Sequence, residues 1–181
     1  MPAADLAARM LRERQAARTR PPVTLTTPPA IINARQRLLL GIVDRETVQK
    51  AFGTAFPHAG WHGYAVIEQA ARAERRDLFV LYDEGGKVRA IELREAGPQS
   101  PLKRLEPREY GAFRILPGAV GIGDRFERLD EAYVVARDEA DFPGHDEQYA
   151  ARFTGGRSAV SGSLARIARI AIYAEGVARL P

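Results

Sequence analysis

A β-hairpin signature in the middle of the chain limits its fold more than any other stretch. Residues 78–82 are apolar or aromatic, residues 83–86 read Asp-Glu-Gly-Gly, and residues 87–93 alternate between polar and apolar side chains. Glycine supplies the positive φ that a tight connection between two strands needs. The pattern therefore predicts two adjacent antiparallel strands, at residues 78–83 and 87–94.

The two ends of this hairpin carry acidic residues. Asp77 opens the first predicted strand, and Glu92 lies near the end of the second. Those two ends are neighbours in an antiparallel pair. If the two side chains converge there, their carboxylates can hold a divalent cation. A surface hairpin with charged ends is the alternative interpretation of the same residues.

Composition bounds the class of protein. A chain of 181 residues with 45% hydrophobic and 28% charged residues fits one domain with a single core. It has no run of eighteen apolar residues, which argues against a membrane-spanning helix, and its N-terminus lacks the apolar core of a signal peptide. It has no cysteine, so disulfides and thiolate metal sites are excluded. We therefore expect a cytoplasmic protein.

Apolar spacing predicts the remaining elements. Three helices are predicted, at residues 44–55, 61–75 and 163–178. Two further strands are predicted, at residues 111–116 and 131–137. Asp44 is expected to cap the first of these helices. The order of elements predicts an α+β fold, in which a mostly antiparallel sheet of about four strands is flanked by helices.

The first 37 residues carry most of the positive charge. They contain seven arginines against two acidic residues, a net charge of +5, whereas the whole chain carries +4. Residues 3–18 are rich in helix-forming residues, and two Pro-Pro pairs within residues 19–30 predict an extended spacer. We therefore expect a basic helical arm and spacer over residues 1–30, followed by a single α+β domain over residues 31–181.

This arm is the segment expected to bind a partner. Dense positive charge complements an acidic protein surface or the phosphates of a nucleic acid. The main hypothesis is a non-enzymatic interaction or assembly component whose arm docks on another subunit, including a second copy, or on an acidic partner. A nucleic acid is the second candidate partner, and no cofactor is expected. The arginines expected to make the contact are Arg9, Arg12, Arg14, Arg18 and Arg20.

The hairpin also supports an alternative hypothesis. With Asp77 followed by Glu92-Leu-Arg94, the stretch 68–101 resembles the core of the PD-(D/E)xK nuclease superfamily. The resemblance implies that Asp77, Glu92 and Glu68, the last on a preceding helix, bind Mg²⁺ or Mn²⁺, with catalysis by Asp77, Glu92 and residue 94. Arg94 replaces the family's lysine, and it can stabilise negative charge but cannot act as a base. The implied activity is phosphodiester hydrolysis, in an active or degenerate form.

The histidines suggest a third hypothesis. His58 and His62 are four residues apart, which is the spacing of two metal ligands on one helix face. Together with His145 they would leave one position open for water, as catalytic zinc sites do. The alternative interpretation is a helix start anchored by Trp61 and Tyr64, with both nearby histidines half-exposed.

Overall fold

The strands of this protein form one large sheet and one small sheet. The computed structural model describes residues 3–19, 24–69, 73–136 and 142–181, and within them are thirteen strands, two α-helices and one short 3-10 helix. The protein is therefore mostly β, and the predicted fold holds only in part: the mostly antiparallel sheet is present, but it has ten strands where about four were expected, and only one of the three predicted flanking helices is found in the described residues. The error arises because two of the three helices predicted after the arm are strands.

The elements have the following bounds. The helices are α1 (Ala3–Thr19) and α2 (Arg45–Phe52), and the 3-10 helix is η1 (Phe126–Arg128). The large sheet contains β1 (Thr24–Leu25), β4 (Phe56–His58), β5 (Trp61–Gln69), β6 (Ala73–Tyr82), β7 (Val88–Glu95), β8 (Arg108–Gly111), β10 (Val134–Val135), β11 (Glu147–Phe153), β12 (Gly156–Ser163) and β13 (Arg166–Ala174). The small sheet contains β2 (Ala30–Ile32), β3 (Arg37–Leu38) and β9 (Arg114–Leu116).

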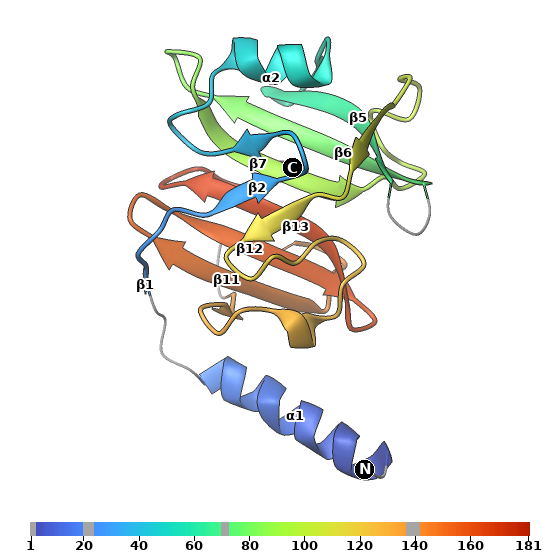
Figure 1. Cartoon of the computed structure of the whole chain (residues 1–181), viewed down its shortest axis with the longest axis vertical. Coiled ribbons are helices and arrows are strands. Elements are labelled where there is room, and N and C mark those ends of the chain that lie inside the picture. Colours follow the sequence, from blue (N-terminus) through green and yellow to red (C-terminus); the bar gives the residue numbers. More distant parts are fainter. Residues whose placement is uncertain (1–2, 20–23, 70–72, 137–141) are drawn as a thin grey trace.

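The large sheet is built from two three-stranded antiparallel meanders. One is β5-β6-β7 and the other is β11-β12-β13, and they join where β7 pairs antiparallel with β13. Ile91 lies opposite Ile172 in this central pair. Figure 1 shows the first meander in the upper half of the molecule and the second meander below it. The centre of the sheet therefore depends on residues about eighty positions apart in the chain.

Short strands cover both long edges of this sheet. On one side β4 pairs antiparallel and β8 pairs parallel with β5. On the other side β10 pairs antiparallel and β1 pairs parallel with β11. Thr24 and Leu25, which lie in the predicted Pro-rich spacer, thus add a strand to the sheet. Short edge strands of this kind are poor templates for pairing with the strand of another chain.

The predicted hairpin and the predicted helix after Asp44 are both confirmed. β6 and β7 pair antiparallel, and the Asp83 carboxylate accepts the backbone N–H of Lys87 (2.9 Å) across the turn. Gly86 in this turn has φ 79°. Asp44 caps α2 by accepting the backbone N–H of Thr47 (2.8 Å). Both elements follow from short-range interactions.

The helices predicted at 61–75 and 163–178 are wrong. Residues 61–69 form β5, residues 73–82 form β6, and β13 occupies most of the last stretch. Both faces of the sheet are buried, so apolar residues run along each strand without the alternation that marks a half-buried strand. A short apolar stretch of that kind has no periodicity that separates strand from helix.

The two remaining strand predictions hold only in part. The stretch 111–116 divides between β8, which ends at Gly111 in the large sheet, and β9, which begins at Arg114 in the small sheet. The stretch 131–137 contains only the two residues of β10, and Arg137 lies outside the described residues. The break at 112–113 moves the chain from one sheet to the other, and that change depends on tertiary packing.

The first face of the large sheet packs against the small sheet and α2. Tyr64, Leu78 and Ile172 contribute to this core, which Ile31 and Ile115 of the small sheet close. The core also includes buried residues of α2. Removing this much apolar surface from water is the main favourable contribution to folding.

The second face is closed by loops and by the end of the chain. Phe79, Ala90 and Tyr173 lie on this face and pack against Leu102 and Leu180. Phe79 and Tyr173 come from the two different meanders, so this core also joins them. The acidic hairpin residues lie on this second face.

Helix α1 projects beyond the edge of the large sheet at β10. It occupies one end of the molecule in Figure 1 and contacts β10. The helix predicted over residues 3–18 is therefore present with nearly the expected bounds. Neither described α-helix combines the length and the apolar character needed to cross a membrane.

Candidate functional site

The hairpin places three predicted site residues on one face. Asp77 lies directly opposite Arg94, and Glu92 lies opposite Phe79 in the same pair of strands. Because side chains two apart on a strand share a face, Asp77, Glu92 and Arg94 all belong to the second face. Both carboxylates are covered, with Asp77 5% and Glu92 0% exposed. The local pattern thus located these groups, but it gave no sign of their burial.

Glu92 is fully engaged by protein donors. Its Oε2 accepts two bonds from Arg94, one from Nε (2.9 Å) and one from Nη2 (2.5 Å). Its Oε1 accepts the backbone N–H of Leu180 (3.0 Å) and the hydroxyl of Tyr173. Four donors on one buried carboxylate compensate for its loss of hydration. As arranged here, Glu92 holds the end of the chain against β7 and offers no oxygen to a metal ion.

A buried hydrogen-bond network continues from Tyr173. The guanidinium group of Arg169, which is completely buried, donates to the Tyr173 hydroxyl (2.7 Å) and to Ser161 Oγ (2.8 Å). Ser161 Oγ also lies 2.9 Å from His145 Nδ1. Sequence reasoning missed this network because it placed Arg169 and Tyr173 on an expected helix. Their even spacing along a strand, which puts them on one face, is the signal that would have linked them.

The ring of Phe142 covers the basic part of this network. The guanidinium carbons of Arg94 and Arg169 each lie 4.8 Å from its centroid, and that of Arg179 lies 5.8 Å away. Cation–π contact stabilises these partly desolvated charges. Burial, together with the charges of Arg169 and Arg94, lowers the pKa of His145 below its usual range. The network therefore favours the neutral form of this histidine.

Asp77 organises the loop that covers the second face. Its Oδ2 accepts a hydrogen bond from Ser100 Oγ (2.5 Å), and Ser100 Oγ in turn accepts the backbone N–H of Leu102 (3.0 Å). Leu102 is completely buried. Burial raises the pKa of Asp77, although the bond from Ser100 opposes that shift. In this arrangement the Asp77 carboxylate holds the loop through Ser100 in place on the second face.

Glu68 lies on the opposite face of the sheet. It is on strand β5, and the expected helix is absent at this position. Its carboxylate accepts bonds from the backbone N–H of Phe113 (3.1 Å) and from Arg76 Nε (3.1 Å), and burial raises its pKa. Glu68 pairs with Glu74, three residues from Asp77 on β6, so Glu68 and Asp77 point to opposite faces. The structure does not bring the three predicted metal ligands together.

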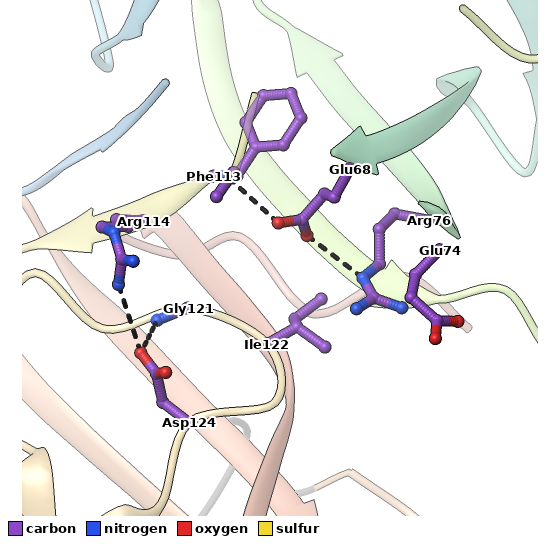
Figure 2. A pocket seen from close by; sticks show the side chains of 9 residues that line it. Glu68, Glu74, Arg76, Phe113, Arg114, Gly121, Ile122 and Asp124 are labelled. Carbon is purple, nitrogen blue, oxygen red and sulfur yellow. Dashed lines mark hydrogen bonds and ion pairs between the residues drawn. The ribbon is translucent and has the colours of Figure 1, made fainter. Parts of the chain in front are cut away.

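A cleft of about 100 Å³ adjoins Glu68 on the first face. Figure 2 shows Ile122 between two charged groups, one formed by Glu68, Glu74 and Arg76 and the other by Arg114 and Asp124. Its lining residues are Glu68, Glu74, Arg76, Ala112, Phe113, Arg114, Gly121, Ile122 and Asp124. Asp124 accepts the backbone N–H of Gly121 (2.8 Å) and a longer bond from Arg114 (3.4 Å). The cleft therefore has an apolar centre and a rim that carries both signs of charge.

The three histidines occupy separate surroundings. The ring of His62 meets the edge of Tyr82 (4.9 Å between centroids), and burial lowers its pKa. His58 lies near Phe79 (6.0 Å between centroids), whereas His145 belongs to the network around Ser161. Across the described ranges, no group of three histidine, cysteine or acidic side chains is placed to hold a metal ion.

Helix α1 presents charged and apolar side chains to solvent. Arg9 and Arg12 are exposed, and Arg9 Nε pairs with Glu13 Oε1 (2.8 Å) one turn away. Leu6 is 49% exposed. The side chains of Arg14 and Arg18 and all of Arg20, which were also predicted to bind a partner, lie outside the described residues.

Comparison with known proteins provides no relative for this chain. The sequence matches no protein family and no curated protein, and the fold matches no solved structure. Function must therefore be argued from the chain's own geometry. In that geometry the hairpin carboxylates are engaged by protein donors, whereas α1 exposes a leucine and basic side chains.

Proposed function

We propose that this chain is a non-enzymatic interaction or assembly component that docks α1 on an acidic surface of another subunit. The observation that carries the proposal is α1 itself, a 17-residue helix that projects beyond the β10 edge of the large sheet and exposes Leu6. In proteins most helical stability comes from packing an apolar stripe against a neighbouring surface. Docking on a second surface would supply that packing.

The charge distribution supports a second copy of the chain as the acidic partner. Residues 124–147 contain nine acidic residues against three arginines, a net charge of −6, whereas residues 1–37 carry +5. β10, which α1 contacts, lies inside that acidic segment. Complementary charge raises the rate of association and selects the orientation of the two surfaces. The same helix reaching the β10 region of another copy would join two chains without a new binding surface.

The proposal is tested by measuring the mass of the assembly that the full chain forms, with and without charge reversal in the arm. We expect native mass spectrometry of the full chain to show a multiple of 19.9 kDa. Replacing Arg9→Glu and Arg12→Glu should weaken the assembly strongly, because two attractive contacts become repulsive. The matched control, Arg9→Lys with Arg12→Lys, keeps both charges and should assemble normally.

Two outcomes would contradict α1 docking. One is a full chain that remains at 19.9 kDa at high micromolar concentration. The other is an assembly whose dissociation constant is the same in the charge-reversed and control variants. Binding of a DNA or RNA oligonucleotide that is lost only with the charge reversal would instead identify a nucleic acid as the partner.

A second candidate function is metal-dependent phosphodiester hydrolysis of the PD-(D/E)xK type. Its support is the position of Asp77, Glu92 and Arg94 on one face of the β6-β7 hairpin. A metal ion at this site would have to displace Arg94 from Glu92 and open the cover formed by Leu180. This candidate predicts one tightly bound Mn²⁺ that Asp77→Asn abolishes, with plasmid cleavage restored or increased by Arg94→Lys. Absence of bound Mn²⁺ from the folded chain would remove its support.

A further inference from the structure

The hairpin between β12 and β13 ends in an exposed apolar tip. Leu164 and Ala165 form the two-residue connection between Ser163 and Arg166, and Leu164 is 91% exposed. Both connecting residues have positive φ, 55° and 62°. Turns of this kind ordinarily carry Asn-Gly, because other side chains are disfavoured in this conformation. An exposed leucine in a disfavoured conformation adds nothing to the chain's own core, which points to a contact outside the chain.

Two arginines stand at the base of this tip. Arg125 and Arg166 lie opposite each other in an antiparallel bridge, and both side chains are exposed. Like charges in facing positions repel each other. Arg166 offsets part of this repulsion by donating a hydrogen bond to the backbone carbonyl of Gly123 (2.8 Å). A projection with an apolar tip and two arginines beneath it is complementary to an apolar hollow with acidic residues at its rim.

The cleft beside Glu68 has part of this complementary character. Ile122 lies at its centre, and its rim carries the carboxylates of Glu68, Glu74 and Asp124 together with the guanidinium groups of Arg76 and Arg114. Three carboxylates against two guanidinium groups leave the rim with a net negative charge. The volume is about 100 Å³. Cavities of roughly 150 Å³ accommodate a benzene molecule, so this volume is of the right order for the isobutyl group of one leucine.

The tip and the cleft adjoin on the same molecule. Asp124 lines the cleft and directly precedes Arg125 at the base of the tip. Two backbone bonds tie this segment to the start of β13, from Gly123 N to Ile167 O (2.8 Å) and from Ile167 N to Asp124 O (2.9 Å). A surface that carries both a projection and a matching hollow can pair with itself about a two-fold axis, because each copy gives and receives the same contact.

We propose that this face is a self-association surface, in which Leu164 of each copy inserts into the cleft of the other. Arg125 and Arg166 then face Glu74 and Asp124 of the second copy, which relieves the repulsion between the two arginines. This contact does not involve α1, so it stands or fails separately from the docking of the arm. The cleft is therefore occupied by Leu164 of a second copy of this chain.

The experiment removes the apolar tip while improving the turn. The full-length variant Leu164→Asn with Ala165→Gly carries the residue pair that this turn type prefers, so its folding is expected to be preserved. By sedimentation velocity, we expect its self-dissociation constant to rise by about tenfold or more, because one leucine per copy loses its burial. Ile42→Asn is the matched control. Ile42 is also exposed (69%) but lies outside this face, so its replacement should leave association unchanged.

Exchanging the charges of two facing residues distinguishes the proposed contact from non-specific association. Arg166→Glu and Glu74→Arg should each weaken association, and the double variant should recover at least part of the loss. Three results would overturn the proposal. They are a full chain that is monomeric at every concentration, an equal effect of the Leu164 and Ile42 substitutions, and a double variant no better than the two single variants combined. The arm variants report on α1 alone, so failure of either contact can be recognised.

Discussion

The second face of the large sheet and helix α1 both carry arginine–carboxylate pairs, but in opposite environments. Glu92 and Arg94 pair in a core where the carboxylate has no exposed surface, whereas Arg9 and Glu13 pair on a helix surface with more than half of each side chain in water. The buried pair is surrounded by further donors that complete it. The exposed pair can rearrange at little cost. This difference separates charge that holds the fold from charge that is available to a partner.

The largest effect is expected from breaking the buried pair. Glu92→Ala would leave Arg94 Nε and the hydroxyl of Tyr173 without their acceptor inside a covered core. Removing one member of a buried ion pair typically lowers the free energy of unfolding by about 3–5 kcal/mol. Urea denaturation followed by tryptophan fluorescence measures this, since Trp61 packs in the same core. An unchanged free energy of unfolding in this variant would show that the network is not needed for the fold.

An intermediate effect is expected from acidification. Burial lowers the pKa of His145, the charges of Arg169 and Arg94 lower it further, and Asp146 opposes these shifts. The unfolded chain therefore binds the proton of this histidine more readily than the folded chain, and stability falls as the pH drops below about 6.5. Comparison with His145→Gln isolates this contribution, because the variant should lose part of the decline. Identical pH profiles would assign the decline to other groups.

The smallest effect is expected from breaking the exposed pair. Arg9→Ala removes the ion pair with Glu13 on the surface of α1. Solvent screens such pairs, so no measurable change in the free energy of unfolding is expected. Assembly should nevertheless weaken if α1 docks on an acidic surface. A variant that is destabilised but assembles normally would reverse the contrast between the two regions.

Part of the candidate site was predictable because it lies within one hairpin. Asp77, Glu92 and Arg94 share a face as a result of a short turn and strict strand pairing, both of which are local. The donors that surround Glu92 were not predictable, since Tyr173 and Leu180 lie more than eighty residues further along the chain. No local pattern specifies that β13 pairs with the other side of β7.

By itself, the sequence determined the elements that depend on neighbouring residues. Asp44 caps α2, the Asp-Glu-Gly-Gly turn closes β6 on β7, and strong helix formers build α1. The tertiary structure decided that β5 and β13 are strands, because burial on both faces replaces alternation with a continuous apolar run. It also decided which charges are enclosed. Burial is set by contacts between distant segments, and the free energy of a charge depends on that burial more than on its neighbours in sequence.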